Sequence, residues 1–209
     1  MQIEIIKRDD IESKLKTRKL YEACFDEGKD DFINYYYDTI IKRNEMVVAR
    51  EGDEVLSMIH LNPYVYNICG DIKNVHYLVA IATKKEHRGK GLMASCMNKA
   101  VEYLKSLSEP FCYLVPENDG VKKAYTRIGF EIVSKFSIDK FSDDKFDIYP
   151  QNNDEYIELM KNEENFLKFE SDEYVESLKN KIVMFNVLDN KNYNIDYFKS
   201  KKIYVCQEV

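Results

Sequence analysis

The 209-residue sequence lacks any two cysteines spaced as Cys-x-x-Cys, and its five cysteines are an odd number. Neither a zinc site nor a disulfide framework is therefore indicated, and we expect a reduced, cytoplasmic protein without a metal. Cys96 and Cys112 stand in apolar patterns and are expected to be buried. No apolar run approaches the length that spans a membrane, and the N-terminal residues lack the apolar segment of a signal peptide.

Positive charge is also in deficit, with 31 Lys and Arg against 37 Asp and Glu and a net charge of -6. This deficit argues against nucleic acid as the main partner. It is compatible with an amine-bearing substrate, although plain solubility explains it equally well. The contents of 44% hydrophobic and 33% charged residues are ordinary for a soluble globular protein of one domain, with or without an appendage. High Lys, Asn, Ile and Tyr usage suggests an AT-rich bacterial genome.

The most informative stretch begins with the apolar and β-branched run Val75–Thr83, which predicts a strand buried on both faces. A short polar segment, the turn Arg88-Gly89-Lys90-Gly91 and a helical pattern to about Ser106 follow. This is a phosphate-binding layout, because glycines let the backbone approach an anion and a helix start offers unpaired N–H groups. It is not a P-loop, because Gly91 is not followed by Lys and Ser/Thr, nor a dinucleotide-binding fingerprint, which needs three glycines.

Apolar periodicity and turn residues predict the other elements up to residue 138. The predicted strands are Gln2–Ile6, Met46–Arg50, Val55–Leu61, Tyr64–Ile68, Lys73–Thr83, Phe111–Val115 and Glu131–Ile138, with Asn62-Pro63 ending the third. The predicted helices start at Asp9 or Asp10, at Asp30, at Gly91 and at Val121. The helix from Gly91 supplies the crossover that makes the Phe111–Val115 strand parallel to its predecessor.

The chain after residue 136 is less regular. It predicts acidic amphipathic helices at Tyr156–Lys168 and Asp172–Asn180 and strands at Ile182–Val187 and Ile203–Cys206. The strand that pairs with Glu131–Ile138 is left open between residues 145–149 and one of these tail strands.

Two motifs resemble those of the GNAT superfamily, the acetyl-CoA-dependent N-acetyltransferases. Motif A of that family, Arg/Gln-x-x-Gly-x-Gly/Ala after a strand, is read here as Arg88–Met93, with Met93 departing at the last position. Motif B has a Tyr seven residues after an Asn and a Gly-Phe pair four residues later, as in Asn118, Tyr125 and Gly129-Phe130.

The resemblance covers about residues 1–136, and Leu92-Met93 looks like the N-terminal domain of "enhanced intracellular survival" acetyltransferases. It implies an α/β (α+β) GNAT fold with a mixed, mostly antiparallel central sheet flanked by helices. In this fold the strands Val75–Thr83 and Phe111–Val115 are parallel and splay apart. Residues 137–209 are expected to form an α/β C-terminal extension that packs on or completes the same domain.

The resemblance also implies the chemistry, which is direct acetyl transfer from acetyl-CoA as cosubstrate to a primary amine. Backbone N–H groups would hold the CoA pyrophosphate, namely those of Arg88, Gly89, Lys90, Gly91, Leu92 and Met93. The pantetheine arm would pair with the backbone of Ile81 and Thr83 like an added strand, and the N–H of Ala82 or Thr83 would face the thioester carbonyl. Tyr125 would protonate the leaving thiolate, and Asn118 would bind the arm or cap the short helix.

The general base is left open. His60, His76 and His87 are the only histidines, and His76 lies on the predicted strand Lys73–Thr83. Glu117 and the terminal carboxylate of Val209 are further candidates, and ordered water could also take the proton.

The three consecutive tyrosines Tyr35-Tyr36-Tyr37 have two interpretations. Either two rings pack and one lies at the surface, or the three form an aromatic wall of an acceptor pocket.

The function also has more than one interpretation. Beside the acetyltransferase, the chain could be a non-catalytic module that binds acyl-CoA. In a third interpretation, the acidic tail binds a partner or a dimer mate, and the chain is accordingly a monomer or a homodimer.

Overall fold

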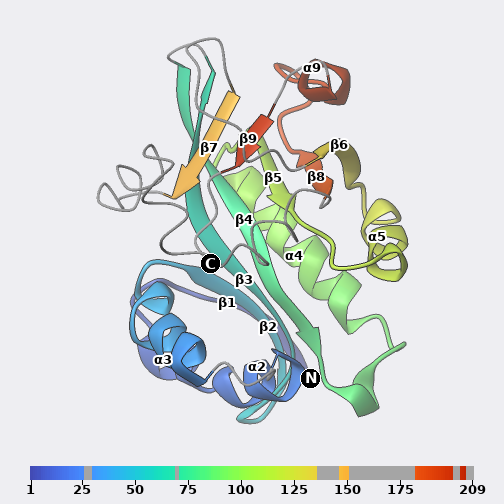
Figure 1. Ribbon diagram of the computed structural model, residues 1–209. Coiled ribbons are helices and arrows are strands. Elements are labelled where there is room, and N and C mark those ends of the chain that lie inside the picture. Colours follow the sequence, from blue (N-terminus) through green and yellow to red (C-terminus); the bar gives the residue numbers. More distant parts are fainter. Residues whose placement is uncertain (26–29, 69–70, 136–145, 151–181, 200–202, 206–209) are drawn as a thin grey trace. The chain divides into compact units, whose positions relative to one another are not determined.

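The computed structural model in Figure 1 describes residues 1–25, 30–68, 71–135, 146–150, 182–199 and 203–205. The strands are β1 (Gln2–Ile6), β2 (Glu45–Glu51), β3 (Glu54–Ile68), β4 (Asp71–Thr83), β5 (Phe111–Leu114), β6 (Glu131–Lys135), β7 (Phe146–Pro150), β8 (Ile182–Val187) and β9 (Ile203–Val205). The helices are α1 (Ile11–Leu15), α2 (Arg18–Phe25), α3 (Asp30–Asp38), α4 (Leu92–Ser106), α5 (Asp119–Thr126) and α9 (Ile195–Lys199), with 3₁₀ turns η1 (Ile40–Lys42) and η2 (Lys85–His87).

The strands are hydrogen-bonded in the order β1-β2-β3-β4-β5-β8-β6, while β7 pairs with β3 and with β9. The sheet is mixed, with β4 and β5 parallel and helices flanking it, which confirms the predicted fold class. The chain forms two compact units, residues 1–62 with 77–107 and residues 63–76 with 108–209.

The first unit contains β1, β2, the start of β3 and the end of β4. Side chains of successive strand residues point to opposite faces. On one face, Met46 and Val48 of β2 join the buried side chains of α2 and α3 in a hydrophobic cluster. Helix α4 contacts β1 and β2. Its buried residues recur at helical spacing, as the sequence predicts, at Leu92, Cys96, Met97, Ala100 and Leu104.

Lys14 is the charged exception in this unit, because its side chain is completely buried. Its ammonium donates to three main-chain carbonyls, those of Arg8 at 2.7 Å and of Ile41 and Asn44 at 2.6 Å. Three acceptors match the three N–H bonds of an ammonium group, so the charge is buried with its hydrogen bonds complete.

The second unit contains the end of β3, the start of β4, and β5 to β9 with α5 and α9. Strand β8 pairs antiparallel with both β5 and β6. Three fully buried rings from β5, β8 and α9 form its core: the Phe111 and Phe185 rings stack at 4.3 Å, and Phe198 lies 5.0 Å and 5.3 Å from them. Residues of the tail therefore contribute to the core of this unit.

One prediction about β3 is wrong, because the strand does not end at Asn62-Pro63 but runs unbroken from Glu54 to Ile68. Proline lacks the N–H that a ladder requires and is normally confined to unpaired positions. The structure meets this condition, since the ladder with β2 ends at Leu61 and the ladder with β7 begins at Tyr64. Pro63 lies between the two ladders, where β7 replaces β2 as a partner of β3 while β4 pairs with its other edge.

The open question about the partner of β6 is answered by the tail. Strand β8, predicted at the same residues, pairs with β6, whereas β7 pairs with β3. Gly129, with φ +94°, precedes β6, and a Cβ there would lie 3.3 Å from Asn186 Nδ2 of β8. The Asn186 amide donates to the Ile128 carbonyl at 3.2 Å, which ties the Gly129 turn to β8.

Several further predictions are confirmed. Strand β1 has the predicted limits, and Asp10 caps α1 by accepting from the Ser13 N–H. Cys96 and Cys112 are fully buried, and burial raises the pKa of the Cys96 thiol to about 11.

The helices expected at 156–168 and 172–180 lie outside the described residues, and the domain boundary near residue 136 stays a prediction. Within the described residues, no helix is long and apolar enough to cross a membrane.

Candidate functional site

The loop between β4 and α4 has the backbone of an anion-binding turn. Gly89 and Gly91 have φ values of +75° and +79°, a region that residues with a Cβ adopt only under strain. Gly91 caps α4 without a side-chain hydrogen bond, and the first helical bond runs from the Ser95 N–H to the Gly91 carbonyl. The N–H groups of the first turn, which include those of Leu92 and Met93, therefore have no partner within the helix.

Motif A, read at Arg88–Met93, spans this loop and the start of α4. Its fourth position, Gly91, is the N-cap of α4, and its last position, Met93, is the second residue of the helix. The departure of Met93 from the motif stays a prediction.

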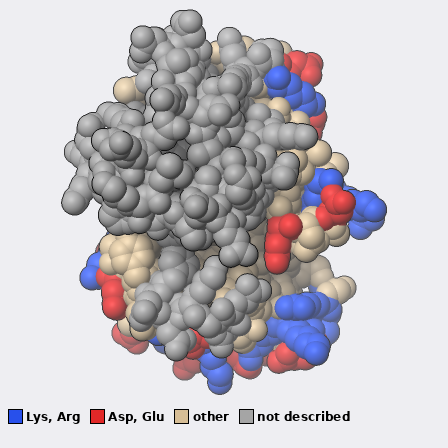
Figure 2. Space-filling model, viewed as in Figure 1, with Lys and Arg blue, Asp and Glu red and all other residues tan. Residues whose placement is uncertain are grey.

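Basic side chains surround this loop. Lys85, Arg88 and Lys90 are basic residues of this segment, and Figure 2 shows a cluster of Lys and Arg at the lower right, where Figure 1 has the loop between β4 and α4. Arg88 is also tied to the strand, because its Nε donates to the Thr83 carbonyl at 3.1 Å. The structure thus brings the predicted pyrophosphate loop and the end of β4 together.

The end of β4 has an irregular backbone. Ala80 has φ +50°, which is rare for a residue with a Cβ and marks a local distortion of the strand. The next residues, Ile81, Ala82 and Thr83, are the ones predicted to bind the pantetheine arm. The Ala82 carbonyl accepts from the Ser57 hydroxyl of β3 at 2.9 Å, and Thr83 Oγ1 lies 2.8 Å from Ser57 Oγ. Sequence reasoning missed Ser57, since no motif distinguishes a single serine in a strand.

Asn118 and Tyr125 are both associated with α5 in the second unit. Asn118 caps the helix, since its Oδ1 accepts from the N–H groups of Gly120 at 3.0 Å and Val121 at 3.2 Å. Of its two predicted roles the structure thus shows capping. Tyr125 is buried, and its ring lies 6.2 Å from that of Phe130. Burial, with a smaller effect of the Glu117 charge, raises the Tyr125 pKa to about 12, so the phenol keeps its proton far above neutral pH.

The predicted site residues divide between the units. Ile81–Thr83 and Arg88–Met93 belong to the first unit, and Asn118 with Tyr125 to the second. Within each unit the predicted groups are linked, by the Arg88–Thr83 hydrogen bond in the first and by helix α5 in the second.

Two histidines are buried in polar contacts. His60 Nδ1 lies 3.1 Å from the Tyr36 hydroxyl, and its Nε2 has no partner among the described residues. Burial, with a smaller effect of the Lys14 charge, lowers the His60 pKa to about 3, so this imidazole is neutral and a poor proton acceptor. His76 Nδ1 lies 2.6 Å from Glu109 Oε1 in the second unit, and both side chains are nearly buried.

The remaining base candidates are less constrained. His87 is half-buried in η2, Glu117 is exposed, and Val209 lies outside the described residues. The part of the chain that the structure describes has no group of three or more His, Cys, Asp or Glu side chains that could hold a metal ion.

The three consecutive tyrosines of α3 divide as the first interpretation predicts. Tyr36 and Tyr37 are buried, whereas 46% of Tyr35 is exposed. Tyr36 and Tyr37 pack with Tyr21 of α2, with ring centroids 5.3 Å and 5.6 Å from it, and the His60 ring completes the cluster. Tyr36 and Tyr37 thus pack in the core of the first unit.

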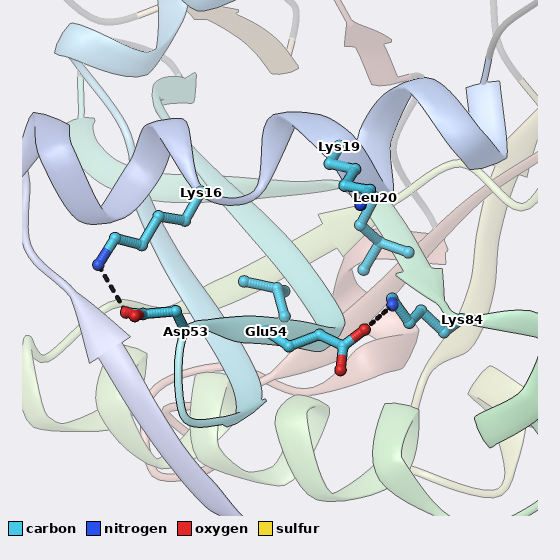
Figure 3. A pocket seen from close by; sticks show the side chains of 7 residues that line it. Lys16, Lys19, Leu20, Asp53, Glu54 and Lys84 are labelled. Atoms are coloured by element: carbon cyan, nitrogen blue, oxygen red, sulfur yellow. Dashed lines mark hydrogen bonds and ion pairs between the residues drawn. The ribbon is translucent and has the colours of Figure 1, made fainter.

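A surface groove of about 320 Å³ lies beside the end of β4 in the first unit (Figure 3). Two ion pairs cross it, Lys16 with Asp53 at 2.9 Å and Lys84 with Glu54, over an apolar base of Leu20 and Val55. The groove has no imidazole or thiol in its lining, and its carboxylates are paired with ammonium groups. Together with Lys19, these ion pairs make the groove a charged surface beside the loop.

Residues 4–133 match the family described as "Acetyltransferase (GNAT) domain". No curated protein matches the chain. Among solved structures, the aminoglycoside 6′-acetyltransferase type Ii is 13% identical with a TM-score of 0.56, over 91% of this chain and 99% of that one. A putative N-acetyltransferase from Lactobacillus plantarum is 14% identical with a TM-score of 0.55, over 90% and 99% of the two chains.

A third similar structure is a conserved protein of unknown function from Enterococcus faecalis V583, described as a probable N-acyltransferase. It is 14% identical with a TM-score of 0.54, over 64% of this chain and 33% of that one. The chain therefore spans about a third of the length of that protein. At such low identities, these structures establish a common fold and nothing finer.

Proposed function

Because the chain belongs to the family of GNAT acetyltransferase domains, we propose that it moves an acetyl group from acetyl-CoA directly to a primary amine. The observation that carries the proposal is the loop between β4 and α4. It combines two left-handed glycines, unpaired N–H groups at a helix start and basic side chains. This combination suits a pyrophosphate, whose oxygens accept from backbone N–H groups and whose charge favours a helix N-terminus.

In the proposed reaction, the pyrophosphate binds the N–H groups of residues 88–93, and the pantetheine arm pairs with the backbone of Ile81 and Thr83. The neutral amine attacks the thioester carbon, and the carbonyl oxygen gains negative charge that the N–H of Thr83 stabilises, because the backbone groups of Ala82 face β3. Collapse of this tetrahedral species breaks the carbon–sulfur bond and releases the CoA thiolate. The amide product loses the proton that the amine nitrogen carried.

Tyr125 is the proposed donor of a proton to the leaving thiolate. Its raised pKa supports this role, because the phenol is fully protonated at the pH of the reaction. We assign the removal of the amine proton to ordered water. His60 is neutral, buried and a weak base, which argues against it as the acceptor. His76 is hydrogen-bonded to Glu109 through Nδ1, which leaves Nε2 as the acceptor nitrogen, so His76 stays the alternative base.

The acceptor stays open among small-molecule amines, aminoglycosides, polyamines, amino acids and protein lysines or N-termini. The net charge of -6 is compatible with a cationic acceptor and does not distinguish among these classes. The pair Leu92-Met93 supports the branch of survival-type acetyltransferases, to which we propose that the chain is functionally related.

The first test is thermal denaturation with acetyl-CoA, CoA or NAD. At about a thousand times its Kd, a ligand adds roughly 4 kcal/mol, which means a shift on the order of 10 °C for a chain of this size. We expect a shift with acetyl-CoA and CoA but none with NAD. Release of free CoA thiol in the presence of an amine panel would then establish turnover. A protein that acetyl-CoA does not stabilise would contradict the proposal.

A second candidate function is a non-catalytic module that binds acyl-CoA. It is favoured by the burial of His60, which lowers its pKa to about 3 and removes one of the three histidines as a base. Stabilisation by acetyl-CoA without thiol release across the whole amine panel would identify this second function.

A further inference from the structure

Ser57 is a buried polar residue that the proposed chemistry does not yet use. It lies on β3, and its side chain is completely buried. Its hydroxyl donates to the Ala82 carbonyl at 2.9 Å and lies 2.8 Å from Thr83 Oγ1. Both partners belong to the part of β4 that is proposed to bind the acyl donor.

The direction of these hydrogen bonds follows from counting protons. A serine hydroxyl has one proton, and Ser57 uses it for the Ala82 carbonyl. The Thr83 hydroxyl must therefore be the donor in the 2.8 Å contact with Ser57. A directed chain results, from the Thr83 hydroxyl through Ser57 to the Ala82 carbonyl. Beyond it, the Thr83 carbonyl accepts from Arg88 of the phosphate-binding loop.

This chain reinforces the direction that the backbone of β4 faces, which the bond from the Lys84 N–H to the Leu56 carbonyl of β3 at 2.9 Å also sets. Successive residues of a strand direct their N–H and C=O groups to opposite edges. Because Ser57 holds the Ala82 carbonyl toward β3, the backbone groups of Ile81 and Thr83 face the edge away from β3. These are the groups that an added strand would need, and they are the ones proposed to pair with the pantetheine arm.

The need for such a side-chain tether follows from Ala80. Its φ of +50° interrupts the regular strand geometry two residues before the Ala82 carbonyl. A distorted strand end can rotate and present its carbonyls to the wrong edge. The Ser57 hydroxyl, buried and unable to exchange its partners for water, opposes this rotation.

We propose that Ser57 is a positioning residue for the acyl donor, which fixes the edge of β4 that receives the pantetheine arm through its hydrogen bonds to Ala82 and Thr83. This inference rests on the proposed function. It assigns Ser57 no contact with the substrate and no part in proton transfer.

The test separates the pantetheine arm from the nucleotide part of the donor. Calorimetry would compare acetyl-CoA with 3′-phospho-ADP, which contains the pyrophosphate but no arm. For Ser57→Ala we expect acetyl-CoA affinity to fall about fivefold to tenfold, the effect of one or two buried hydrogen bonds. The affinity for 3′-phospho-ADP should stay within about twofold of the wild-type value, because the loop keeps its own geometry.

Three variants provide the controls. Ser57→Thr keeps the hydroxyl and should restore acetyl-CoA affinity, whereas Ser57→Cys has nearly the same volume but a weak donor and should behave like Ser57→Ala. Thr83→Val has almost the shape of threonine, removes the first link of the chain, and leaves Ser57 intact. Combined with Ser57→Ala it should add nothing to the loss, because both variants break one chain.

The outcomes are distinct. If Ser57→Ala and Ser57→Cys bind acetyl-CoA as tightly as wild type, or lose both ligands equally, the inference is overturned while the proposed function stands. If wild-type protein binds neither ligand, the proposed function fails and the inference fails with it. Should Ser57→Ala not fold, Thr83→Val alone decides, with a selective loss of acetyl-CoA expected.

Discussion

The ammonium of Lys14 lies 2.6 Å from the main-chain carbonyl of Asn44, thirty residues further along the chain. With its bonds to the carbonyls of Arg8 and Ile41, it joins the end of β1 to the turn that precedes β2. A buried charge is tolerated only where its hydrogen bonds are complete, so this position should be highly sensitive to substitution.

Lys14→Met should therefore destabilise the protein strongly. The methionine fills the space but leaves three carbonyls without a donor, those of Ile41 and Asn44 buried and that of Arg8 partly buried, which costs about 3 kcal/mol or more. Urea denaturation measures the loss. Lys16→Met is the matched control, because Lys16 is exposed and has only a surface pair with Asp53. Equal midpoints for the two variants would disprove the role assigned to Lys14.

His60 should make the protein sensitive to acid. Its folded-state pKa of about 3 lies below the ordinary value of 6.5, so the unfolded chain binds more protons between these values. The free energy of unfolding should accordingly fall as the pH decreases from 6.5 toward 3, by on the order of 3 kcal/mol at pH 4.

The measurement is urea denaturation at several pH values, with the slope against pH as the readout. His60→Gln should flatten the slope, and His87→Gln, at a half-buried histidine, should leave it unchanged. A His60→Gln variant whose stability falls with pH as steeply as wild type would show that another group is responsible.

The sequence predicted the limits of several strands and the glycine loop between β4 and α4 better than it predicted which strands pair with one another. Apolar runs such as Gln2–Ile6 and Ile182–Val187 are strands with the predicted limits, because burial on the sheet depends on local pattern. Pro63 led to the wrong prediction that a strand ends there. A proline ends a strand only where a ladder needs its N–H, and here the ladder that continues β3 is formed with β7, 80 or more residues further along the chain.

In the candidate site, too, features with a local sequence pattern could be predicted, whereas contacts between distant residues could not. Glycines with positive φ leave a readable signal at Gly89 and Gly91, because few other residues tolerate that conformation. Ser57 leaves none, since its contribution arises only when β3 places its hydroxyl against Ala82. The commitment of His76 to Glu109 likewise joins a strand to a loop 33 residues away and has no local pattern.

Tyr125→Phe should lower turnover about tenfold or more and leave acetyl-CoA affinity nearly unchanged, if Tyr125 is the general acid. The phenol is protonated up to its raised pKa of about 12, so the ratio of wild-type to variant turnover should stay constant between about pH 7 and 10. Thiol-release kinetics over this range check both statements. An unchanged turnover number would remove Tyr125 from the mechanism.

Gly89→Ala and Gly91→Ala should weaken acetyl-CoA binding about fivefold or more, because each puts a Cβ on a left-handed residue and costs about 1 kcal/mol of strain in the bound geometry. No steric clash contributes, since a Cβ at either position meets no atom within 4 Å. Calorimetry measures the affinity, and denaturation measures the strain.

Gly52→Ala is the matched control. Gly52 lies in the turn between β2 and β3 with φ +60°, and its Cβ would also meet no atom within 4 Å. It should cost the same stability yet leave acetyl-CoA affinity intact. Equal loss of affinity in all three variants would mean that general destabilisation is measured instead of the loop.

The insertion of β8 between β5 and β6 affects the order in which a nascent chain can fold. Among the described strands β6 pairs with β8 alone, and residues 182–187 leave the ribosome long after residues 131–135. During that interval, β6 has no partner and presents two unpaired edges, a state prone to wrong pairing. Residues 4–133, which match the family, thus cannot complete their own sheet, and β6 gains its partner only after residues 182–187 have been synthesised.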